Sequence, residues 1–402
     1  MNKSVLISGI GIGGPTLAYW LARAGFRPTL VEQAPELRTD GYVIDFWGLG
    51  YDIAERMGLV GEIERAGYHA QEMYVVNDHG RRLAGFGTKV FKELTGGRYV
   101  TVARSELSRL LFEKSAGSAE VIFGDELLAI DDRTTGVDVK LRRGGRRQFD
   151  LVIGADGLHS MVRQLGFDPR SWSEKQLGYT VAAFDVAGYR PRDEARYVMY
   201  NQPGRMVGRF ALNGDRTLFL FVFESDTSDP PTQPAPSVQK AILREKYAKG
   251  QWECRRILDE LDVTRNLYFD RVSQVKMAAW SRGRICLVGD AAFCVSLAAG
   301  QGAALAMTAA YILAGELAAT DGQHGEAFAR YERLLRTYVA SKQRGAERFS
   351  AALAPRTRMG LFVRNQVIKA AAIPGLARLT FGADIIDRLQ LPEYRWAAAA
   401  VN

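Results

Sequence analysis

Two glycine-rich segments, far apart in the chain, carry the residue types that bind phosphate and ribose groups. The first is Gly9-Ile-Gly11-Ile-Gly13-Gly14, whose glycine spacing allows a tight turn, a close backbone approach to a pyrophosphate and close packing of the next helix. The start of that helix would offer free N–H groups to the phosphates. Glu32, followed by Gln33, stands where a carboxylate accepts hydrogen bonds from ribose hydroxyls. The pattern predicts a dinucleotide site without choosing between NAD and FAD.

The second segment begins at Gly289-Asp290 and continues to Gly300-Gln301-Gly302. The apolar run 285–288 predicts a strand that delivers Asp290 at its carboxyl end, where ligands of open α/β sheets bind. A helix opening after Gly300 would direct its amides and positive dipole end toward negative charge on a ligand. Asp290 could instead cap a helix begun at Ala291, and the two roles are compatible.

Short apolar runs and helical periodicity predict the elements that position these segments. Residues 5–7 and 29–32 are expected strands on either side of a helix over 15–24, which makes a parallel βαβ unit. The remaining expected elements of this layer are helices over 52–66 and 105–115 and buried strands over 150–153 and 285–288.

A second kind of sequence lies between these elements. Residues 73–76, 82–86 and 179–223 alternate apolar and polar side chains around turn signals, which is typical of antiparallel strands. Over 217–224 the alternation places three phenylalanines, at 219, 221 and 223, on one face. That face either walls a pocket or packs in a core, and Phe221 and Tyr197 are the candidate substrate contacts.

The layout predicts an α/β protein in which a nucleotide-binding domain is interrupted twice by a sheet-rich domain. The expected boundaries are 1–70, 100–172 and 273–325 for the nucleotide-binding domain, 71–99 and 173–272 for the substrate-binding sheet domain, and 326–402 for a C-terminal helical region. Residues 225–236 are expected to form a loop.

Composition excludes several classes of protein. The 402 residues carry a net charge of +8 with scattered basic residues, so nucleic acid is not an expected partner. Basic residues between 342 and 369 are expected on a solvated helical face. Three cysteines and four histidines without metal-ligand spacing predict neither a disulfide framework nor a metal site, and they suit a cytoplasmic protein. The uncharged stretch 291–315 is long enough to span a bilayer, but its glycines favour a loop entering a buried helix.

The chain resembles the FAD-dependent aromatic hydroxylases of the para-hydroxybenzoate hydroxylase type, which include tetracycline-inactivating monooxygenases. The resemblance covers nearly the whole chain, from Val5 to about Ala354, and rests on three motifs in order. These are the first glycine triplet, Asp156-Gly157-x-x-Ser160-x-x-Arg163, and Gly289-Asp290. It implies a Rossmann-like FAD-binding domain, a mixed or antiparallel substrate sheet and a C-terminal helical tail.

The resemblance also implies roles for particular residues. Asp290 would hold the flavin ribityl chain, and Asp156 and Gly157 would serve the pyrophosphate region, although the middle motif could equally be a structural turn network. Arg104 matches an arginine that contacts the flavin. Arg38 and Asp45 match positions near the flavin and the nicotinamide more loosely.

The chain departs from the family pattern at the second glycine segment. Phe293 stands where the family usually has histidine, Ser296-Leu297 replaces a proline pair, and Ala304 replaces a common asparagine. These changes put the rigidity of the loop beside the flavin in question.

The resemblance implies a monooxygenase that uses FAD, NADPH or NADH as a transient reductant, and O₂. It would hydroxylate an aromatic or polycyclic small molecule through a C4a-hydroperoxyflavin, so no catalytic side-chain constellation is required. The expected protein is cytoplasmic, without a membrane partner, and a monomer or weak homodimer. Two alternatives are an FAD oxidoreductase of the same fold without oxygen insertion and a catalytically inactive flavin-binding regulator.

Overall fold

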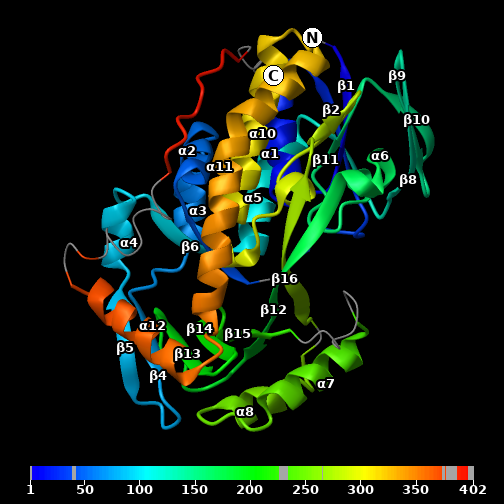
Figure 1. The fold of residues 1–402 in the computed structure, drawn as a ribbon. Helices are drawn as coiled ribbons and strands as arrows, with labels where there is room; N and C mark the ends of the chain where they lie inside the picture. Colours follow the sequence, from blue (N-terminus) through cyan, green and yellow to red (C-terminus); the bar gives the residue numbers. More distant parts are fainter. Residues whose placement is uncertain are drawn as a thin grey trace.

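Strands from both ends of the chain form one sheet in this computed structural model, which describes residues 2–38, 42–225, 234–264, 266–373, 376 and 387–396. The order β17-β18-β11-β1-β2-β7 places β11 between β1, near the N-terminus, and β18, near residue 285 (Figure 1). All neighbours pair in parallel except β17 and β18. The strands are β1 (Ser4–Ser8), β2 (Arg27–Glu32), β7 (Glu120–Phe123), β11 (Leu151–Gly154), β17 (Ser281–Arg282) and β18 (Ile285–Leu287).

Helices α1 (Gly13–Arg23), α5 (Arg104–Ala116) and α10 (Gly302–Ala319) pack together in this layer, as the apolar periodicity predicts. The single helix expected over 52–66 is wrong: Gly58, with φ +71°, separates α2 (Leu49–Arg56) from α3 (Val60–Ala66). Helix α10 is long and apolar enough to cross a membrane, but 72% of it is buried inside the protein. The prediction of a loop entering a buried helix is therefore confirmed.

The expected strands of the second layer join β16, which the sequence analysis did not predict, in a seven-stranded sheet in the order β16-β12-β15-β14-β13-β4-β5. Its neighbours are antiparallel except for the parallel pair β4 and β13. In Figure 1, β12 and β16 run from this sheet to the first layer, and β16 passes across the domain boundary expected at 272/273. The strands are β4 (Glu72–Val76), β5 (Arg82–Gly87), β12 (Trp172–Ala187), β13 (Arg196–Gln202), β14 (Arg205–Ala211), β15 (Arg216–Glu224) and β16 (Tyr268–Met277).

Several elements were not expected from the sequence. A three-stranded sheet projects at one side, helices α7 and α8 cover the outer face of the seven-stranded sheet, and β3 pairs with β6 (Figure 1). Part of the loop expected at 225–236 lies outside the described residues, and α7 begins at Pro236. The elements are β3 (Val43–Trp47), α4 (Lys89–Leu94), β6 (Tyr99–Ala103), β8 (Leu127–Arg133), β9 (Gly136–Leu141), β10 (Gly145–Phe149), α6 (Met161–Gly166), α7 (Pro236–Tyr247) and α8 (Cys254–Asp259). Helix α9 (Asp290–Phe293) lies where the sequence offered a short helix after Gly289.

The C-terminal region is helical only in part. Helix α11 (His324–Leu353) runs along both layers and α12 (Arg358–Ala371) packs against β5, but residues 387–396 contain no helix (Figure 1). This last segment returns to the first layer, where Trp396 packs on Trp20 with ring centroids 4.6 Å apart. Asp387 accepts a hydrogen bond from the Leu49 amide and pairs with Lys342 at 2.8 Å. Long-range contacts therefore place this segment, which helical periodicity alone does not predict.

Candidate FAD and substrate site

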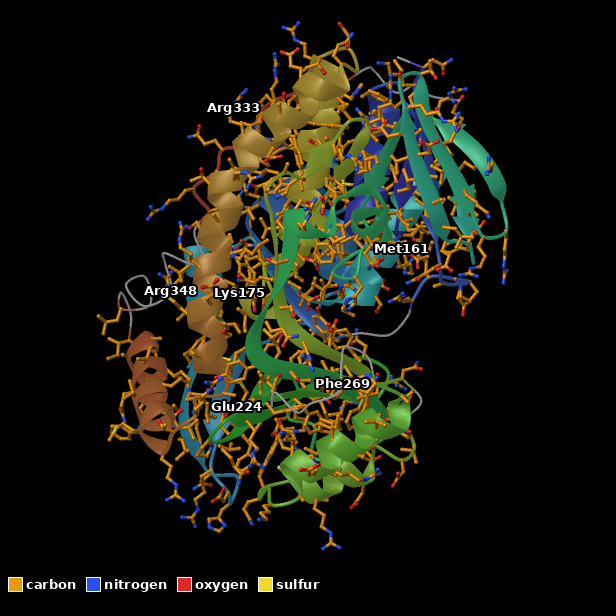
Figure 2. All side chains as sticks on the ribbon, turned by 45° about the vertical axis from the view of Figure 1, so that its right-hand side comes forward. Met161, Lys175, Glu224, Phe269, Arg333 and Arg348 are labelled. Atoms are coloured by element: carbon orange, nitrogen blue, oxygen red, sulfur yellow. The ribbon has the colours of Figure 1, made fainter. Side chains whose placement is uncertain are left out.

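A cavity of about 1720 Å³ lies between the two layers. It is lined by the glycine loop after β1, by the seven-stranded sheet and by α11 and α12. Three of its lining residues, Met161, Phe269 and Arg348, lie on α6, β16 and α11 in Figure 2. Because small-molecule sites usually occupy about 300–1,000 Å³, the cavity has room for two ligands side by side.

The first glycine motif has the backbone geometry that its spacing predicts. Gly9 has φ +103°, and a Cβ on Gly14 would lie 2.0 Å from the Gly9 carbonyl oxygen, so neither position accepts a side chain. A Cβ on Gly11 would meet no described atom within 4 Å, although Gly11 lines the cavity. Among the described residues, no side chain caps the N-terminus of α1. Its free amides therefore face a space that a pyrophosphate fits.

The carboxylate of Glu32 lies at the edge of the same cavity. Glu32 Oε2 accepts from the Ile10 amide at 2.9 Å and Oε1 from the Ala34 amide at 3.1 Å, which fixes the carboxylate at the cavity edge. Gln33 and Arg38 line the cavity beside it, and both are exposed. The structure thus places Glu32, expected at a ribose, beside Gln33 and Arg38, two further residues expected to contact a cofactor.

The middle motif divides into a cavity-facing part and a structural part. Asp156 and Gly157 line the cavity, and burial raises the pKa of Asp156. Ser160 instead caps α6 by accepting from the Arg163 amide at 3.0 Å. The Arg163 side chain is buried over the Trp172 ring and donates to the Ala291 carbonyl oxygen at 2.8 Å. Ser160 and Arg163 therefore belong to a structural turn network that ties this motif to the segment after Asp290.

The second glycine segment forms the opposite wall. Asp290 begins α9 after Gly289, which has φ +60°, and a Cβ on Gly302 would lie 3.9 Å from Asp290 Oδ1. Burial raises the pKa of Asp290, and the positive charge of Arg104 opposes that shift. Gln301 is 4% exposed, lines the cavity, and its Nε2 has no hydrogen-bond partner among the described residues. A buried amide donor facing a cavity indicates a ligand that accepts from it.

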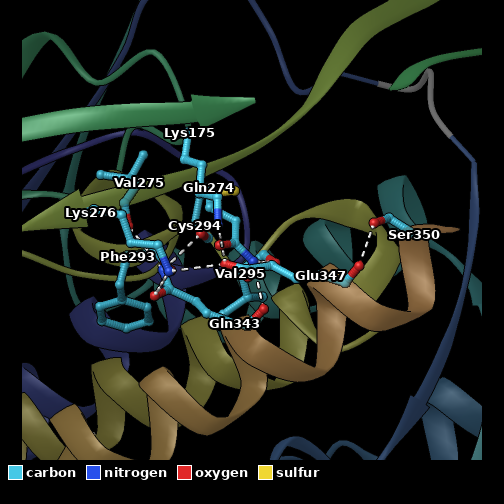
Figure 3. A network of polar contacts seen from close by, with 10 residues as sticks. All are labelled: Lys175, Gln274, Val275, Lys276, Phe293, Cys294, Val295, Gln343, Glu347 and Ser350. Atoms are coloured by element: carbon cyan, nitrogen blue, oxygen red, sulfur yellow. Dashed lines mark hydrogen bonds and ion pairs between the residues drawn. The ribbon is translucent and has the colours of Figure 1, made fainter. Parts of the chain in front are cut away.

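Two buried glutamines hold the loop between Asp290 and Gly302 against α11 (Figure 3). Gln343 Nε2 lies within hydrogen-bond distance of the carbonyl oxygens of Val275 (2.9 Å), Cys294 (3.2 Å) and Phe293 (3.3 Å). Gln274 donates to the Val295 carbonyl oxygen at 3.2 Å. These contacts fix the loop from outside, although it lacks the proline pair of the family.

The three departures from the family pattern have local physical reasons. Phe293 packs on Trp280 with ring centroids 4.5 Å apart. Ser296 has φ +88°, a value that proline does not adopt. Ala304 packs closely against α2, where a Cβ added to Gly50 would lie 2.7 Å from the Ala304 Cβ.

Asp45 belongs to a buried polar cluster on the cavity wall. Its Oδ1 accepts from Tyr99 and Thr101, each at 2.7 Å, and from Tyr197 at 3.2 Å. Tyr197 also stacks on Phe210 with centroids 4.3 Å apart. Burial raises the pKa of Asp45, and the three hydrogen bonds oppose the shift. The structure places both Asp45 and the substrate candidate Tyr197 in the cavity wall.

The prediction for Phe221 is wrong in this structure. Phe221 is 1% exposed, stacks on Phe184 and contacts Tyr247 of α7, so it lies in the core on the outer face of the sheet. The opposite face of β15 lines the cavity through Leu218, Leu220 and Val222. Helices α7 and α8, which the sequence analysis did not predict, cover the phenylalanine face.

Several cavity residues were missed by sequence reasoning. His159 Nε2 lies 3.4 Å from Asp270 Oδ2, and this pairing raises the pKa of His159. Tyr42 and Tyr268 contact each other with centroids 5.3 Å apart, and burial raises the pKa of Tyr42 to about 12. The position of His159 within the middle motif could have indicated that it lies in the cavity wall. No sequence pattern marks Tyr42 or Tyr268 in this way.

The solvated basic face expected near the C-terminus is also wrong in part. Lys342 and Arg364 are half-buried and line the cavity, Arg344 and Arg348 line it while remaining exposed, and Arg356, Arg358 and Lys369 are exposed. Helices α11 and α12 therefore bring positive charge to the ligand space rather than to solvent alone.

The comparisons with known proteins agree with this geometry. The sequence profile of the family described as "FAD binding domain" matches residues 2–352. The chain belongs to this family. A flavin-dependent monooxygenase from an unknown prokaryotic organism is 34% identical over 345 residues, which cover 85% of this chain and 88% of that protein.

Solved structures resemble the chain over almost its full length. The tetracycline destructase Tet(55) is 30% identical with a TM-score of 0.83, covering 98% of this chain and 99% of that one. HpxO from Klebsiella pneumoniae, in complex with FAD and uric acid, is 22% identical with a TM-score of 0.77, covering 95% and 96%. The protein is an FAD-dependent monooxygenase with the expected FAD-binding α/β fold.

Proposed function

We propose that the protein uses NAD(P)H and O₂ to hydroxylate an aromatic or polycyclic small molecule. The observation that supports the proposal is that one continuous cavity is lined both by the two glycine-rich loops and by an apolar wall of the seven-stranded sheet. The loops suit FAD, and the apolar wall suits a substrate ring beside it. That wall includes Leu218, Leu220 and Val222, which would exclude water from the ring being hydroxylated. Small molecules named with related structures, tetracycline for the destructases and uric acid for HpxO, are ring systems as well.

FAD, when bound, supplies the redox chemistry, and the protein supplies binding, orientation and electrostatics. The amides of α1 would hold the pyrophosphate, Glu32 the adenosine ribose and Asp290 the ribityl chain. The N-terminus of α10, with the Gln301 amide, would stabilise negative charge on the flavin ring system. Arg38, at the exposed edge of the cavity, would contact NADPH or NADH transiently. A cytoplasmic location would supply this reductant.

The test is substrate-stimulated NADPH oxidation by the purified flavoprotein, followed by mass analysis of the product. A panel of phenols and polycyclic ketones is expected to contain compounds that accelerate NADPH consumption and gain one oxygen atom. With isotopically labelled O₂, that atom must carry the label. An unlabelled or desaturated product would identify an oxidoreductase without oxygen insertion, and a flavin that NADPH and NADH never reduce would identify a regulatory protein.

A further inference from the structure

Helix α12 carries apolar side chains on the side that faces away from the protein. The helix lies at the edge of the molecule in Figures 1 and 2 and packs on β5 and β13. Its buried residues are Ile368 and Ala371. The large apolar side chains that are exposed on this helix and directly after it are Met359 (70%), Phe362 (58%), Val363 (52%), Val367 (42%) and Ile373 (53%).

These five exposed residues form one stripe, which we call the α12 face. With 3.6 residues per turn, Met359, Phe362 and Val363 lie on one side of the helix and Ile368 lies on the opposite side. Gln366 is the polar side chain within the stripe. Packing on the sheet already accounts for the Ile368 side, so folding does not explain the α12 face. A contiguous exposed apolar patch of this kind marks a site of contact with a protein or a membrane.

The charges around the α12 face are all of one sign. Residues 348–383 contain six basic residues and no aspartate or glutamate. Arg358 and Lys369 are exposed beside the apolar stripe, and neither forms an ion pair within the described part of the chain. Arg356, just before the helix, is already paired with Glu224 at 3.0 Å. Two such faces from two copies of this chain would repel each other, whereas a negatively charged surface would attract the face.

An apolar stripe bordered by cations is the composition of a helix that lies in the surface of a bilayer. The apolar side chains of such a helix enter the boundary between headgroups and acyl chains, and the cations meet anionic headgroups. The α12 face also adjoins the ligand space, because Val367 belongs to the face and lines the cavity together with Arg364 and Ile368. A bilayer at this face would therefore lie close to the cavity.

We propose that α12 docks the protein on the surface of an anionic lipid bilayer. Phe362 and its apolar neighbours enter the interface, and Arg358 and Lys369 contact the negative headgroups. The contact is peripheral, since the long apolar helix α10 is buried inside the protein. This inference goes beyond the proposed function, does not depend on it, and departs from the expectation of a protein without a membrane partner.

The test is flotation of the full-length, FAD-loaded protein with lipid vesicles, without NADPH or substrate. Vesicles of phosphatidylcholine mixed with phosphatidylserine are expected to bind the protein about 10-fold more tightly than vesicles of phosphatidylcholine alone. Phe362→Ser is expected to weaken binding to the mixed vesicles by about 10-fold, because the largest apolar side chain of the face is lost. Arg358→Gln combined with Lys369→Gln is expected to reduce the preference for mixed vesicles to about 2-fold or less.

Matched control variants change the same properties away from α12. Val263→Ser removes an apolar side chain that is 70% exposed, and it is expected to leave vesicle binding unchanged. Lys249→Gln combined with Arg255→Gln removes two exposed cations, and it is expected to keep the preference for mixed vesicles. Flavin absorbance and thermal unfolding are expected to match the parent in every variant, because all the altered side chains are exposed.

The proposal is overturned if neither kind of vesicle binds the protein, if both kinds bind it equally, or if Phe362→Ser binds like the parent. Sedimentation analysis without vesicles tests the other occupant of the face. A dimer that Phe362→Ser dissociates would assign the face to a second copy of the chain and would likewise overturn the proposal. Substrate-stimulated NADPH oxidation is measured separately without vesicles, so failure of the proposed function is distinguished from failure of membrane docking.

Discussion

The loop at residues 9–14 and the loop at residues 293–301 face the same cavity, but different forces shape them. In the first, backbone contacts decide the shape, because Gly9 and Gly14 lie too close to neighbouring atoms to carry a side chain. In the second, Gln343 and Gln274 reach in from α11 and β16 to hold the carbonyl groups. The first loop excludes side chains at Gly9 and Gly14 through its own backbone, whereas the second loop depends on residues distant in sequence.

The largest expected effect comes from filling the first loop. In Gly14→Ala the new Cβ would lie 2.0 Å from the Gly9 carbonyl oxygen, so the turn must open. We expect a loss of about 3 kcal/mol in the free energy of unfolding and loss of bound FAD. Flavin absorbance after purification and urea unfolding measure the two effects.

Gly61→Ala is the matched control for this variant. Gly61 lies in α3, and its Cβ would meet no described atom within 4 Å, so the change is expected to raise stability by up to about 1 kcal/mol through helix propensity. A Gly14→Ala protein that retains FAD and wild-type stability would show that the first loop adapts.

The second effect comes from removing the outside support of the other loop. Gln343→Leu leaves the carbonyl oxygens of Val275, Phe293 and Cys294 without this donor, and it removes the acceptor of Lys276. We expect a loss of about 2 kcal/mol, because buried polar groups lose their partner. Hydrogen exchange is expected to accelerate across residues 293–301 but not across residues 9–14.

The control for that variant is Gln366→Leu, which alters an exposed glutamine on α12. It is expected to leave stability within about 0.5 kcal/mol of the parent. Equal exchange rates at 293–301 in the parent and Gln343→Leu would mean that the loop does not depend on Gln343.

A third test concerns the backbone of the second loop itself. Ser296 has φ +88°, which glycine adopts freely and proline, fixed near −65°, does not. Ser296→Gly is expected to change the free energy of unfolding by less than about 1 kcal/mol, and Ser296→Pro to lower it by about 3 kcal/mol. Denaturant titration compares them, and a stable Ser296→Pro protein would refute this φ assignment.

The contrast between the loops explains what the sequence could predict. The parallel sheet and the convergence of residues 9–14, Glu32 and Asp290 follow from motifs whose shape is local. The support from Gln343 could not be predicted, because nothing in its helical neighbourhood indicates which carbonyl groups it meets. Every residue has a backbone carbonyl group, so the sequence does not reveal which carbonyl oxygens a buried glutamine will bind.

Phe221 teaches the same lesson for packing. Alternation along β15 correctly separates the phenylalanine face from the Leu218 and Leu220 face, but it does not say which face another layer covers. That depends on α7 and α8, which lie beyond the strand in sequence. Arg364 was likewise assigned to a solvated face because the fold of α12 against β5 was not foreseen.

The smallest expected effect concerns the pair of His159 and Asp270, which sequence motifs did not assign. The Asp270 carboxylate, 3.4 Å from His159 Nε2, raises the pKa of His159, and burial partly opposes the shift. A raised pKa in the folded protein stabilises it below the unfolded value of about 6.5. This stabilisation is lost as the pH rises through the folded pKa.

Asp270→Asn is therefore expected to lower the pKa of His159 and to reduce stability at pH 6 but not at pH 9. The His159 side chain is 37% exposed, so solvent screening keeps the difference below about 1 kcal/mol. NMR titration of the histidine resonances measures the pKa, with exposed His79 as the internal control. An unchanged His159 pKa in Asp270→Asn would mean that the cavity, rather than this carboxylate, sets the charge of the histidine.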